Sequence, residues 1–307
     1  MTLAISIVTR RLAFVAADRR YSGVASLNSF LANKVCRLET SDAQGLLTFA
    51  GVGARALKGQ PFELGDWVTN VLRGHIRNLD QSLEVLRTAA VSQRLNSHAS
   101  GHTFIFSGFK DKATPILRVV TALDQLQTIE FSKAETRTAH ALAGDNFRTV
   151  NIEIGRRKVS TFVAGSGGPL LKVGDLRSLV RHILRAPTKE AEVQRLCALT
   201  TDVIRKVSSV ESTVGPEVTC GWVFQEGGGV HATYDAQGKR DNNSGMLPSV
   251  AQGMPISDMM RLLGPLMMDH MSKFIEANEK GETVPPPDDV EMNRLLASID
   301  YKPREKF

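Results

Sequence analysis

The amino-acid sequence predicts an α+β fold in which helices lie outside stacked β-sheets. Runs with strand periodicity and runs with helical periodicity alternate in blocks, in the order strands, two helices, strands, two helices, strands. Blocks of this kind are typical of layered folds, because each helix buries its apolar face against a sheet. The 307 residues are 42% hydrophobic and 23% charged, a composition that supports a sizeable core in a soluble globular protein.

The first block consists of two antiparallel pairs of strands. Thr2–Thr9 and Leu12–Asp18 are short β-rich runs joined by Arg10-Arg11, which predicts a tight hairpin. Lys34–Leu38 and Gly45–Ala50 form the second pair across a polar turn. Residues 53 to 93 then carry apolar side chains at helical spacing, so two amphipathic helices are expected there.

The remaining elements continue this alternation. Strands are expected at Thr103–Phe109, Ile116–Ala122, Val150–Ile154 and Val159–Ala164, with an irregular stretch before the third of them. Two helices and a last strand pair follow at Leu170–Arg185, Thr188–Lys206, Glu217–Gln225 and Val230–Tyr234. These elements account for residues 1–238, which we assign to one domain.

The character of the chain changes after Gly238. Lys239–Gly245 is polar and rich in turn residues, as a linker would be. Ser257–Glu279 predicts a methionine-rich helix, whose apolar stripe is typical of a core or a subunit interface. Gly281–Phe307 predicts a loosely held tail. Residues 239–307 therefore form a C-terminal extension made of a linker, a helix and a flexible tail.

Composition argues against several classes of function. The formal net charge of +6 comes from scattered basic residues, which does not favour a nucleic-acid partner. No apolar run approaches the length of a membrane span, and no basic segment precedes an apolar signal-like run, so a cytoplasmic protein is expected. Cys36, Cys197 and Cys220 are too few and too far apart for a disulfide framework or a metal site, and no metal is expected.

Thr2, Asp18 and Lys34 form a regularly spaced set with catalytic chemistry. Asp18 lies sixteen residues after Thr2 and ends an apolar strand, and Lys34 lies sixteen residues further on. Removal of Met1 would leave a threonine whose amine and hydroxyl belong to one residue, a nucleophile with its own base. A nearby lysine would help to keep that amine neutral, and an aspartate would hold the lysine. The alternative is a buried Asp18–Lys34 ion pair with a purely structural role.

The glycine-rich run at 165–168 has three interpretations. It precedes a predicted helix, so it could simply be a helix-entry loop, or its backbone N–H groups could bind phosphate. The chain lacks GxxxxGK[ST] and the spacing differs from GxSxG, so neither nucleotide binding nor a serine-hydrolase elbow is favoured.

Short motifs along residues 2–235 resemble those of a known superfamily. They are Thr2, the run Ala16-Ala17-Asp18-Arg19-Arg20 with Ser22-Gly23, Asn33-Lys34-Val35, Thr48-Phe49-Ala50-Gly51-Val52-Gly53-Ala54, and Ala164-Gly165-Ser166-Gly167-Gly168-Pro169. In order and spacing they resemble proteasome β-type subunits and the peptidase subunit of the bacterial ATP-dependent two-component protease. Both belong to the N-terminal nucleophile hydrolase superfamily. The extension after residue 238 has no counterpart in this resemblance.

The resemblance implies a four-layer αββα sandwich of two antiparallel sheets flanked by helices. It implies that Thr2 is the nucleophile, that Asp18, Lys34 and Arg20 surround it, and that the Gly51 N–H forms the oxyanion hole. Ser166 would then hydrogen-bond around the threonine amine. The substrate pocket would be lined by Tyr21, Ala32, Cys36, Phe49 and Gly53, and Phe49 would favour small or medium side chains.

In the family, a further aspartate and serine stand near the start of the late strand pair, and here the chain departs from the pattern. The matching segment is 208–215, where Glu211 with Ser212 or Thr213 would replace them. The alignment of this segment is ambiguous by one or two residues, so the sequence leaves the choice open.

The leading hypothesis is a threonine-type peptidase that cleaves peptide or amide bonds without a cofactor. The resemblance implies a peptide or protein substrate, a homo-oligomeric ring or related assembly, and a possible ATPase partner. Two alternatives remain open: a catalytically inactive scaffold or assembly subunit of the same fold, and an amidohydrolase of the superfamily acting on a small molecule.

Overall fold

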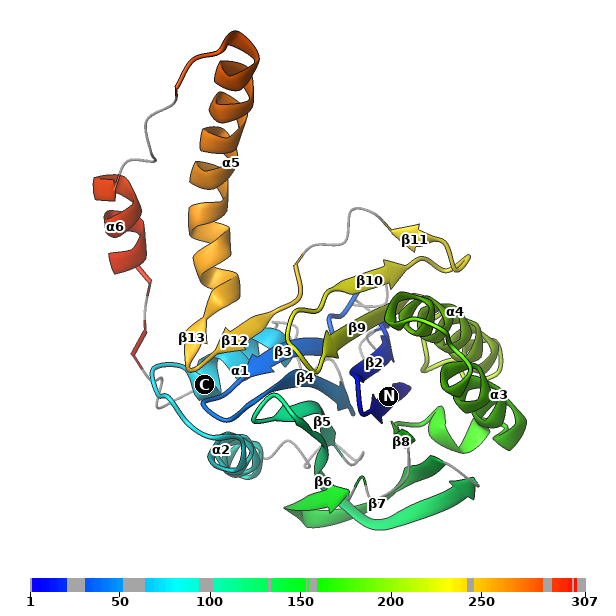
Figure 1. Ribbon diagram of the computed structural model, residues 1–307. Coiled ribbons are helices and arrows are strands. Elements are labelled where there is room, and N and C mark those ends of the chain that lie inside the picture. Colours follow the sequence, from blue (N-terminus) through cyan, green and yellow to red (C-terminus); the bar gives the residue numbers. More distant parts are fainter. Residues whose placement is uncertain are drawn as a thin grey trace.

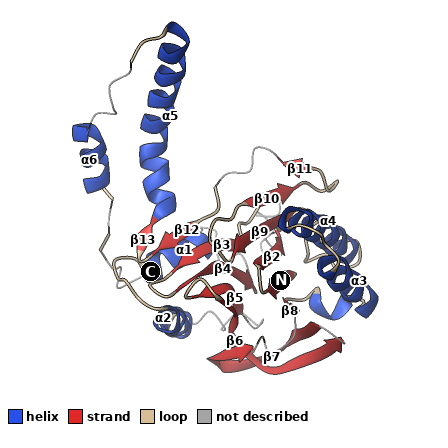
Figure 2. Cartoon of the chain, in the orientation of Figure 1, coloured by secondary structure: helices blue, strands red, loops and turns tan. Residues whose placement is uncertain are grey.

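The computed structural model describes residues 2–20, 31–51, 64–93, 102–131, 134–152, 154, 159–241, 246–283, 289–299 and 301–302. Within these residues, strands form the centre of the molecule, and α1 and α2 lie on the opposite side of it from α3 and α4 (Figures 1 and 2). A long helix, α5, extends away from this body. The predicted α+β class with helices outside the sheets is confirmed.

The strands share one continuous hydrogen-bonded order, β11-β10-β9-β2-β1-β8-β7-β6-β5-β4-β3-β12-β13. Their bounds are β1 Ala4–Thr9, β2 Leu12–Asp18, β3 Val35–Glu39, β4 Ala43–Ala50, β5 Thr103–Lys110, β6 Thr114–Phe131, β7 Ala134–Ile152, β8 Val159–Ala164, β9 Val218–Phe224, β10 His231–Tyr234, β11 Arg240–Asp241, β12 Ser249–Ala251 and β13 Met254–Pro255. Most neighbours are antiparallel, but β7 pairs with β8 in parallel. This pairing links two sheets, one from β11 to β8 and the other from β7 to β13.

The two sheets pack face to face through alternate residues of their strands. On β1 and β2, Ala4, Val8, Ala13, Val15 and Ala17 belong to a buried cluster shared with residues of β3, β4, β5 and β6. The hydroxyls of Ser6 on β1 and Ser107 on β5 also hydrogen-bond across the two sheets. The opposite faces of β1 and β2 point to the helices, because successive side chains of a strand alternate between its faces.

Each outer face is covered by a pair of helices with its own apolar core. One core joins β1, β2 and β9 to α3 (Val173–Leu184) and α4 (Lys189–Ser208), and the other joins β3, β4 and β5 to α1 (Leu64–Leu72) and α2 (Leu79–Ser92). A short 3-10 turn at Gly168–Leu170 precedes α3. The order helix, sheet, sheet, helix is the four-layer αββα arrangement.

Two features of the central region differ from the sequence expectation. The stretch predicted as irregular after residue 122 belongs to β6 and β7, which pair along most of their lengths. Its many polar residues hide the alternation that marks a half-buried strand.

The C-terminal extension also contributes to the sheets, through β11 in the segment predicted as a linker and through β12 beyond that segment. β11 pairs with β10, and β12 pairs with β3 in parallel. Helix α5 spans Ile256–Lys280, close to the prediction, and α6 spans Asp289–Ala297 within the predicted tail. In the described part of the chain, no helix is both long enough and apolar enough to cross a membrane.

Candidate active site

The β1–β2 hairpin brings Thr2 and Asp18 to the same end of the first sheet. Ala4 pairs with Ala17 in the antiparallel register, so the residues just beyond them are neighbours. The Asp18 N–H donates to the Leu3 carbonyl at 3.2 Å, and the Leu3 N–H donates back to Asp18 Oδ1 at 2.8 Å. The hairpin register therefore fixes Asp18 beside the backbone of Thr2.

Lys34 reaches the same point from the second sheet. Its Nζ donates to Thr2 Oγ1 at 2.5 Å and to Asp18 Oδ2 at 3.0 Å. Its carbonyl accepts hydrogen bonds from the Thr48 hydroxyl at 2.9 Å and from the Phe49 N–H at 3.2 Å. Both donors belong to β4, so the second sheet holds the lysine in front of the threonine.

The Asp18 carboxylate is surrounded by donors. Besides Leu3 and Lys34, the N–H groups of Arg20 and Gly215 donate to Oδ2 at 3.2 and 3.0 Å. These donors satisfy the acceptor oxygens of a carboxylate that has no contact with solvent. The Asp18 carboxylate therefore connects the start of β1, the end of β2 and the 211–215 turn through hydrogen bonds.

The three central side chains have almost no contact with solvent. Thr2, Asp18 and Lys34 are all buried. Burial lowers the pKa of Lys34, the charge of Asp18 opposes this effect, and the charge of Arg20 adds to it. A lysine with a lowered pKa beside a threonine hydroxyl is an arrangement suited to proton transfer chemistry.

A second hydrogen-bonded chain ends at Ser166. The Thr213 hydroxyl donates to Glu211 Oε1 at 2.6 Å, and the oxygens of Ser166 and Thr213 are 3.0 Å apart. Since Thr213 uses its proton on Glu211, Ser166 donates to Thr213 and keeps its lone pairs as acceptors. In the structure Thr213, and not Ser212, joins Glu211 to Ser166.

The pKa of Glu211 is lowered by the same contacts. The hydrogen bond from the Thr213 hydroxyl is the main cause, the Thr213 N–H adds to it, and the positive charge of the chain's amino terminus acts in the same direction. The acceptor end of this chain is therefore a carboxylate at neutral pH.

The loop at 165–168 wraps the backbone of Thr2. A side chain at Gly165 would place its Cβ 1.9 Å from the Thr2 carbonyl oxygen, and φ at Gly165 is +100°. Both the space and the backbone angle therefore require glycine. The Gly167 N–H also approaches that carbonyl at 3.4 Å. In this fold the glycine-rich run lets the backbone of the 165–168 loop lie against the backbone of Thr2. The sequence alone did not reveal this contact.

Arg20 contacts the turn that carries Glu211 and Thr213. Its guanidinium donates to the Ser212 carbonyl at 2.7 Å, and its N–H donates to Asp18. Arg20 therefore ties the 211–215 turn to the end of β2.

Gly51 follows β4 directly and is buried. A Cβ at this position would meet the ring of His102 at 2.5 Å, and that ring stacks on Phe49 with centroids 5.3 Å apart. The predicted oxyanion residue therefore lies at the end of β4, the strand whose Thr48 and Phe49 donate to the Lys34 carbonyl.

The residues expected to line the substrate pocket are only partly described. Ala32, Cys36 and Phe49 are buried, and the last two belong to the core between the second sheet and α1 and α2. Burial raises the pKa of the Cys36 thiol to about 12, which disfavours the nucleophilic thiolate at neutral pH. Tyr21 and Gly53 lie outside the described residues.

Sequence reasoning missed three contributors to this site. They are the backbone N–H groups of Leu3 and Gly215, which donate to Asp18, and Gly165, which admits the Thr2 carbonyl. Backbone N–H donors cannot be recognised from the sequence, because almost every residue type has one. Gly165 did carry a signal, because glycine is the residue that permits both positive φ and close backbone approach.

The chain is similar to solved structures at low sequence identity. A mutant of Anbu from Hyphomicrobium sp. strain MC1 is 13% identical, with a TM-score of 0.46, and the match covers 91% of this chain and 100% of that chain. No protein-family model matches the chain, and no curated protein matches it. These comparisons assign the chain to no family, and its function is inferred from the side-chain geometry.

Proposed function

We propose that this protein is a threonine-type hydrolase that cleaves amide bonds in peptides or proteins. The observation that carries the proposal is the position of Lys34 Nζ, which donates to the Thr2 hydroxyl and to the Asp18 carboxylate at once. The Thr2 side chain is buried in the chain that still begins with Met1. The proposal therefore requires that Met1 be removed, which frees the Thr2 amine.

The nucleophile is the Thr2 hydroxyl, and the base is the amine of the same residue. A free α-amine has a pKa of about 7.7–8.0, close to that wanted of a base at neutral pH. The Lys34 ammonium lowers this pKa further by charge repulsion, and Asp18 keeps the ammonium in place. The hydroxyl proton then passes to the amine, directly or through a water, as Oγ attacks the carbonyl carbon of the substrate.

The attack forms a tetrahedral intermediate with a negatively charged oxygen. The Gly51 N–H donates to this oxygen in the proposed arrangement, and the lysine charge lies nearby. The protonated amine of Thr2 gives its proton to the leaving nitrogen, the C–N bond breaks, and an ester to Oγ remains. Water then attacks the ester as the same amine takes its proton. The acyl C–Oγ bond breaks, the amine returns the proton to Oγ, and the acid is released.

Ser166, Thr213 and Glu211 position the amine. Because the Ser166 hydroxyl donates to Thr213, its oxygen has lone pairs available as acceptors. In the proposed arrangement this oxygen accepts a hydrogen bond from the Thr2 amine and so sets the direction of the nitrogen lone pair. Support for this role comes from the 165–167 loop, which packs on the Thr2 backbone. Neither a metal nor an organic cofactor enters the proposed reaction.

The test combines intact-mass measurement with amide hydrolysis on a panel of fluorogenic peptides. We expect the purified chain to lack Met1, a Thr2→Ala variant to lose essentially all activity, and Thr2→Ser to keep a measurable part of it, because serine retains the hydroxyl. Full activity in Thr2→Ala would exclude Thr2 as the nucleophile. Retention of Met1 together with inactivity would favour a scaffold, and activity on small amides alone would favour a small-molecule amidohydrolase.

A further inference from the structure

A small cavity opens between the two sheets on the side of the C-terminal extension. Its volume is about 220 Å³, and its walls come from β3, β4, β9 and β10 together with the chain around β12. β12 pairs with β3 and leads through β13 into α5 (Figure 1). Four lining residues belong to the extension, which has no counterpart in the family resemblance: Met246, Leu247, Ser249 and Ile256. The described residues that line this cavity include none of the candidate active site.

Arg37 faces this cavity from β3. Its neighbours Cys36 and Leu38 belong to the core under α1 and α2, whereas Val35 belongs to the cluster between the sheets. Because side chains alternate along a strand, Arg37 lies on the same side as Val35. Leu46, which pairs with Arg37 on β4, also belongs to the cluster between the sheets. The partly buried guanidinium is therefore directed toward the space between the two sheets, where it lines the cavity.

The walls around this guanidinium are mostly apolar. Leu46 and Leu247 converge opposite Gly221 of β9, since a Cβ at Gly221 would lie 3.4 Å from Leu46 Cδ2 and 3.5 Å from Leu247 Cδ1. Val230 and Met246 also line the cavity and are 58% and 55% exposed, which places them at its mouth. A ligand that enters would therefore remove apolar surface from water, which favours binding.

The positive charge of Arg37 is not balanced by the protein. Within the described part of the chain, no hydrogen bond or ion pair engages its guanidinium, and no lining residue is acidic. Arg37 is the only lysine or arginine among the described lining residues, and His231 is the one histidine. Glu39 lies on the same side of β3 but lines a different cavity. Since a guanidinium keeps its proton, the cavity lacks an anion.

The size of the cavity and its single guanidinium define the ligand. An apolar cavity of about 150 Å³ holds one benzene ring, so this one has room for a phenyl ring or a similar alkyl group with a small polar end. A guanidinium binds a carboxylate through two parallel hydrogen bonds. A phosphate ester carries nearly two negative charges, which one arginine does not offset.

We propose that this cavity binds a small carboxylic acid that carries a single apolar group. The carboxylate lies on the Arg37 guanidinium, and the apolar group packs against Leu46 and Leu247. The C-terminal extension then forms one wall of a ligand site. This inference does not depend on the proposed hydrolase activity.

The test is a titration with phenylacetate, followed by NMR of protein labelled with ¹³C at the methionine methyl groups. The chain has 9 methionines, and the variant Met246→Leu assigns the Met246 signal by its loss. We expect phenylacetate to shift this signal in a saturable way, with a dissociation constant of about 1 mM or tighter. The signals of Met268 and Met271 on α5, assigned in the same manner, should not move.

Analogues separate the contributions of the charge and the apolar group in the wild-type chain. Phenylethanol lacks the carboxylate and acetate lacks the ring, so each should bind at least about 10-fold more weakly than phenylacetate. Phenyl phosphate should also bind more weakly. A blocked dipeptide that ends in phenylalanine carries the same chemistry at the end of a chain. If it bound more tightly than phenylacetate, the carboxylate and apolar group recognised here would be those of a peptide C-terminus.

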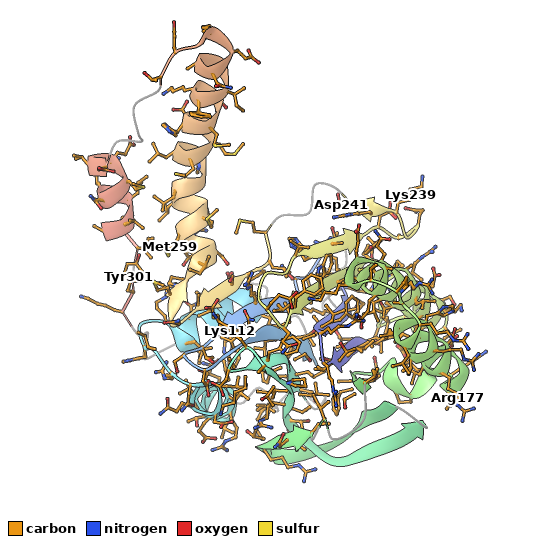
Figure 3. The ribbon with its side chains drawn as sticks, viewed as in Figure 1. Lys112, Arg177, Lys239, Asp241, Met259 and Tyr301 are labelled. Carbon is orange, nitrogen blue, oxygen red and sulfur yellow. The ribbon has the colours of Figure 1, made fainter. Side chains whose placement is uncertain are left out.

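Substitutions of Arg37 test the anion contact. Arg37→Met keeps the length of the side chain but removes its charge, so we expect phenylacetate to bind about 10-fold to 100-fold more weakly. Arg37→Lys keeps the charge without the two parallel hydrogen bonds and should lie between the two. Arg177→Met is the control, because Arg177 is exposed on α3 and points away from the body (Figure 3). It should bind phenylacetate as the wild type does.

A second variant tests the cavity without changing any charge. Val230→Trp places a large ring at the mouth of the cavity, so it should also weaken binding by at least about 10-fold. Val230 is exposed, and the fold should therefore tolerate the change. Val173→Trp is the matched control, because Val173 is 39% exposed on α3, which the first sheet separates from the cavity.

Three results would overturn the proposal. The first is a Met246 signal that does not move, or that moves only together with all other methionine signals. The second is unchanged affinity in Arg37→Met, with far-UV circular dichroism like that of the wild type. The third is binding of phenylethanol or phenyl phosphate at least as tight as that of phenylacetate, which would show that the site does not select a carboxylate.

Discussion

Replacement of Asp18 by asparagine should be among the most damaging isosteric changes in this chain. The carboxylate accepts from Leu3 N at Oδ1, and from Arg20 N, Gly215 N and Lys34 Nζ at Oδ2. An asparagine can offer only one oxygen. The asparagine side chain keeps most of the hydrogen bonds if its oxygen takes the Oδ2 position, where three donors meet. Its amide nitrogen then faces the Leu3 N–H, which loses its acceptor.

The magnitude follows from two losses. The orphaned Leu3 N–H costs about 1–3 kcal/mol. Removing the partner of the buried Lys34 charge costs about 3–5 kcal/mol, less whatever the lysine recovers by losing its proton. Together they predict a loss of at least about 3 kcal/mol in the free energy of unfolding, a large part of the roughly 5–15 kcal/mol of a typical domain.

Urea denaturation followed by circular dichroism measures this loss through the shift of the midpoint at constant slope. Asp202→Asn is the control, because the Asp202 carboxylate is 62% exposed on α4 and pairs with Arg205 only at 4.0 Å. It should change stability by no more than about 0.5 kcal/mol. A loss below about 1 kcal/mol in Asp18→Asn would refute the claim that this carboxylate is the anchor of the site.

Two further changes probe the surroundings of Thr2. Gly165→Ala places a Cβ against the Thr2 carbonyl at a positive φ, so we expect a loss of more than about 1 kcal/mol in the free energy of unfolding together with lower activity. Gly174→Ala is the control, because a Cβ on this helical glycine meets nothing, and it should leave stability unchanged or raise it by up to about 1 kcal/mol. Equal thermal midpoints for the two variants would contradict the close approach. Thr213→Val removes the hydroxyl that joins Glu211 to Ser166, so we expect kcat/KM to fall by about threefold to tenfold, the worth of one hydrogen bond that positions the amine. Thr213→Ser, which keeps a hydroxyl, should retain the wild-type kcat/KM, and an unchanged kcat/KM in Thr213→Val would remove Glu211 from the proposed machinery.

Much of the fold follows from local pattern in the sequence. On β1 and β2, almost every residue is apolar, and such runs predict buried strands without naming the face that each side chain takes. The four-layer order came from the block order together with the family resemblance. β6 and β7 were missed over their polar middle, and β12 was missed because three residues that pair with a distant strand carry no period of their own.

The part of the site that consists of reactive or charged side chains could be predicted from the sequence. Thr2, Asp18 and Lys34 were identified by spacing and charge, and the structure brings the three together. The choice between Ser212 and Thr213 could not be made from sequence, because it depends on the path of a turn. The donors to Asp18 from Leu3 and Gly215 are backbone groups, and every residue except proline has such a donor.

The most direct test of the account is to identify the atom that is acylated. The enzyme would react briefly with an activated ester, be quenched in acid, and be mapped by peptide mass spectrometry with and without hydroxylamine. We predict an acyl group on Thr2 of a chain lacking Met1, removed by hydroxylamine because it is an ester on Oγ. An adduct at another residue alone, or one on the amine that resists hydroxylamine, would contradict the assignment of the Thr2 hydroxyl as nucleophile.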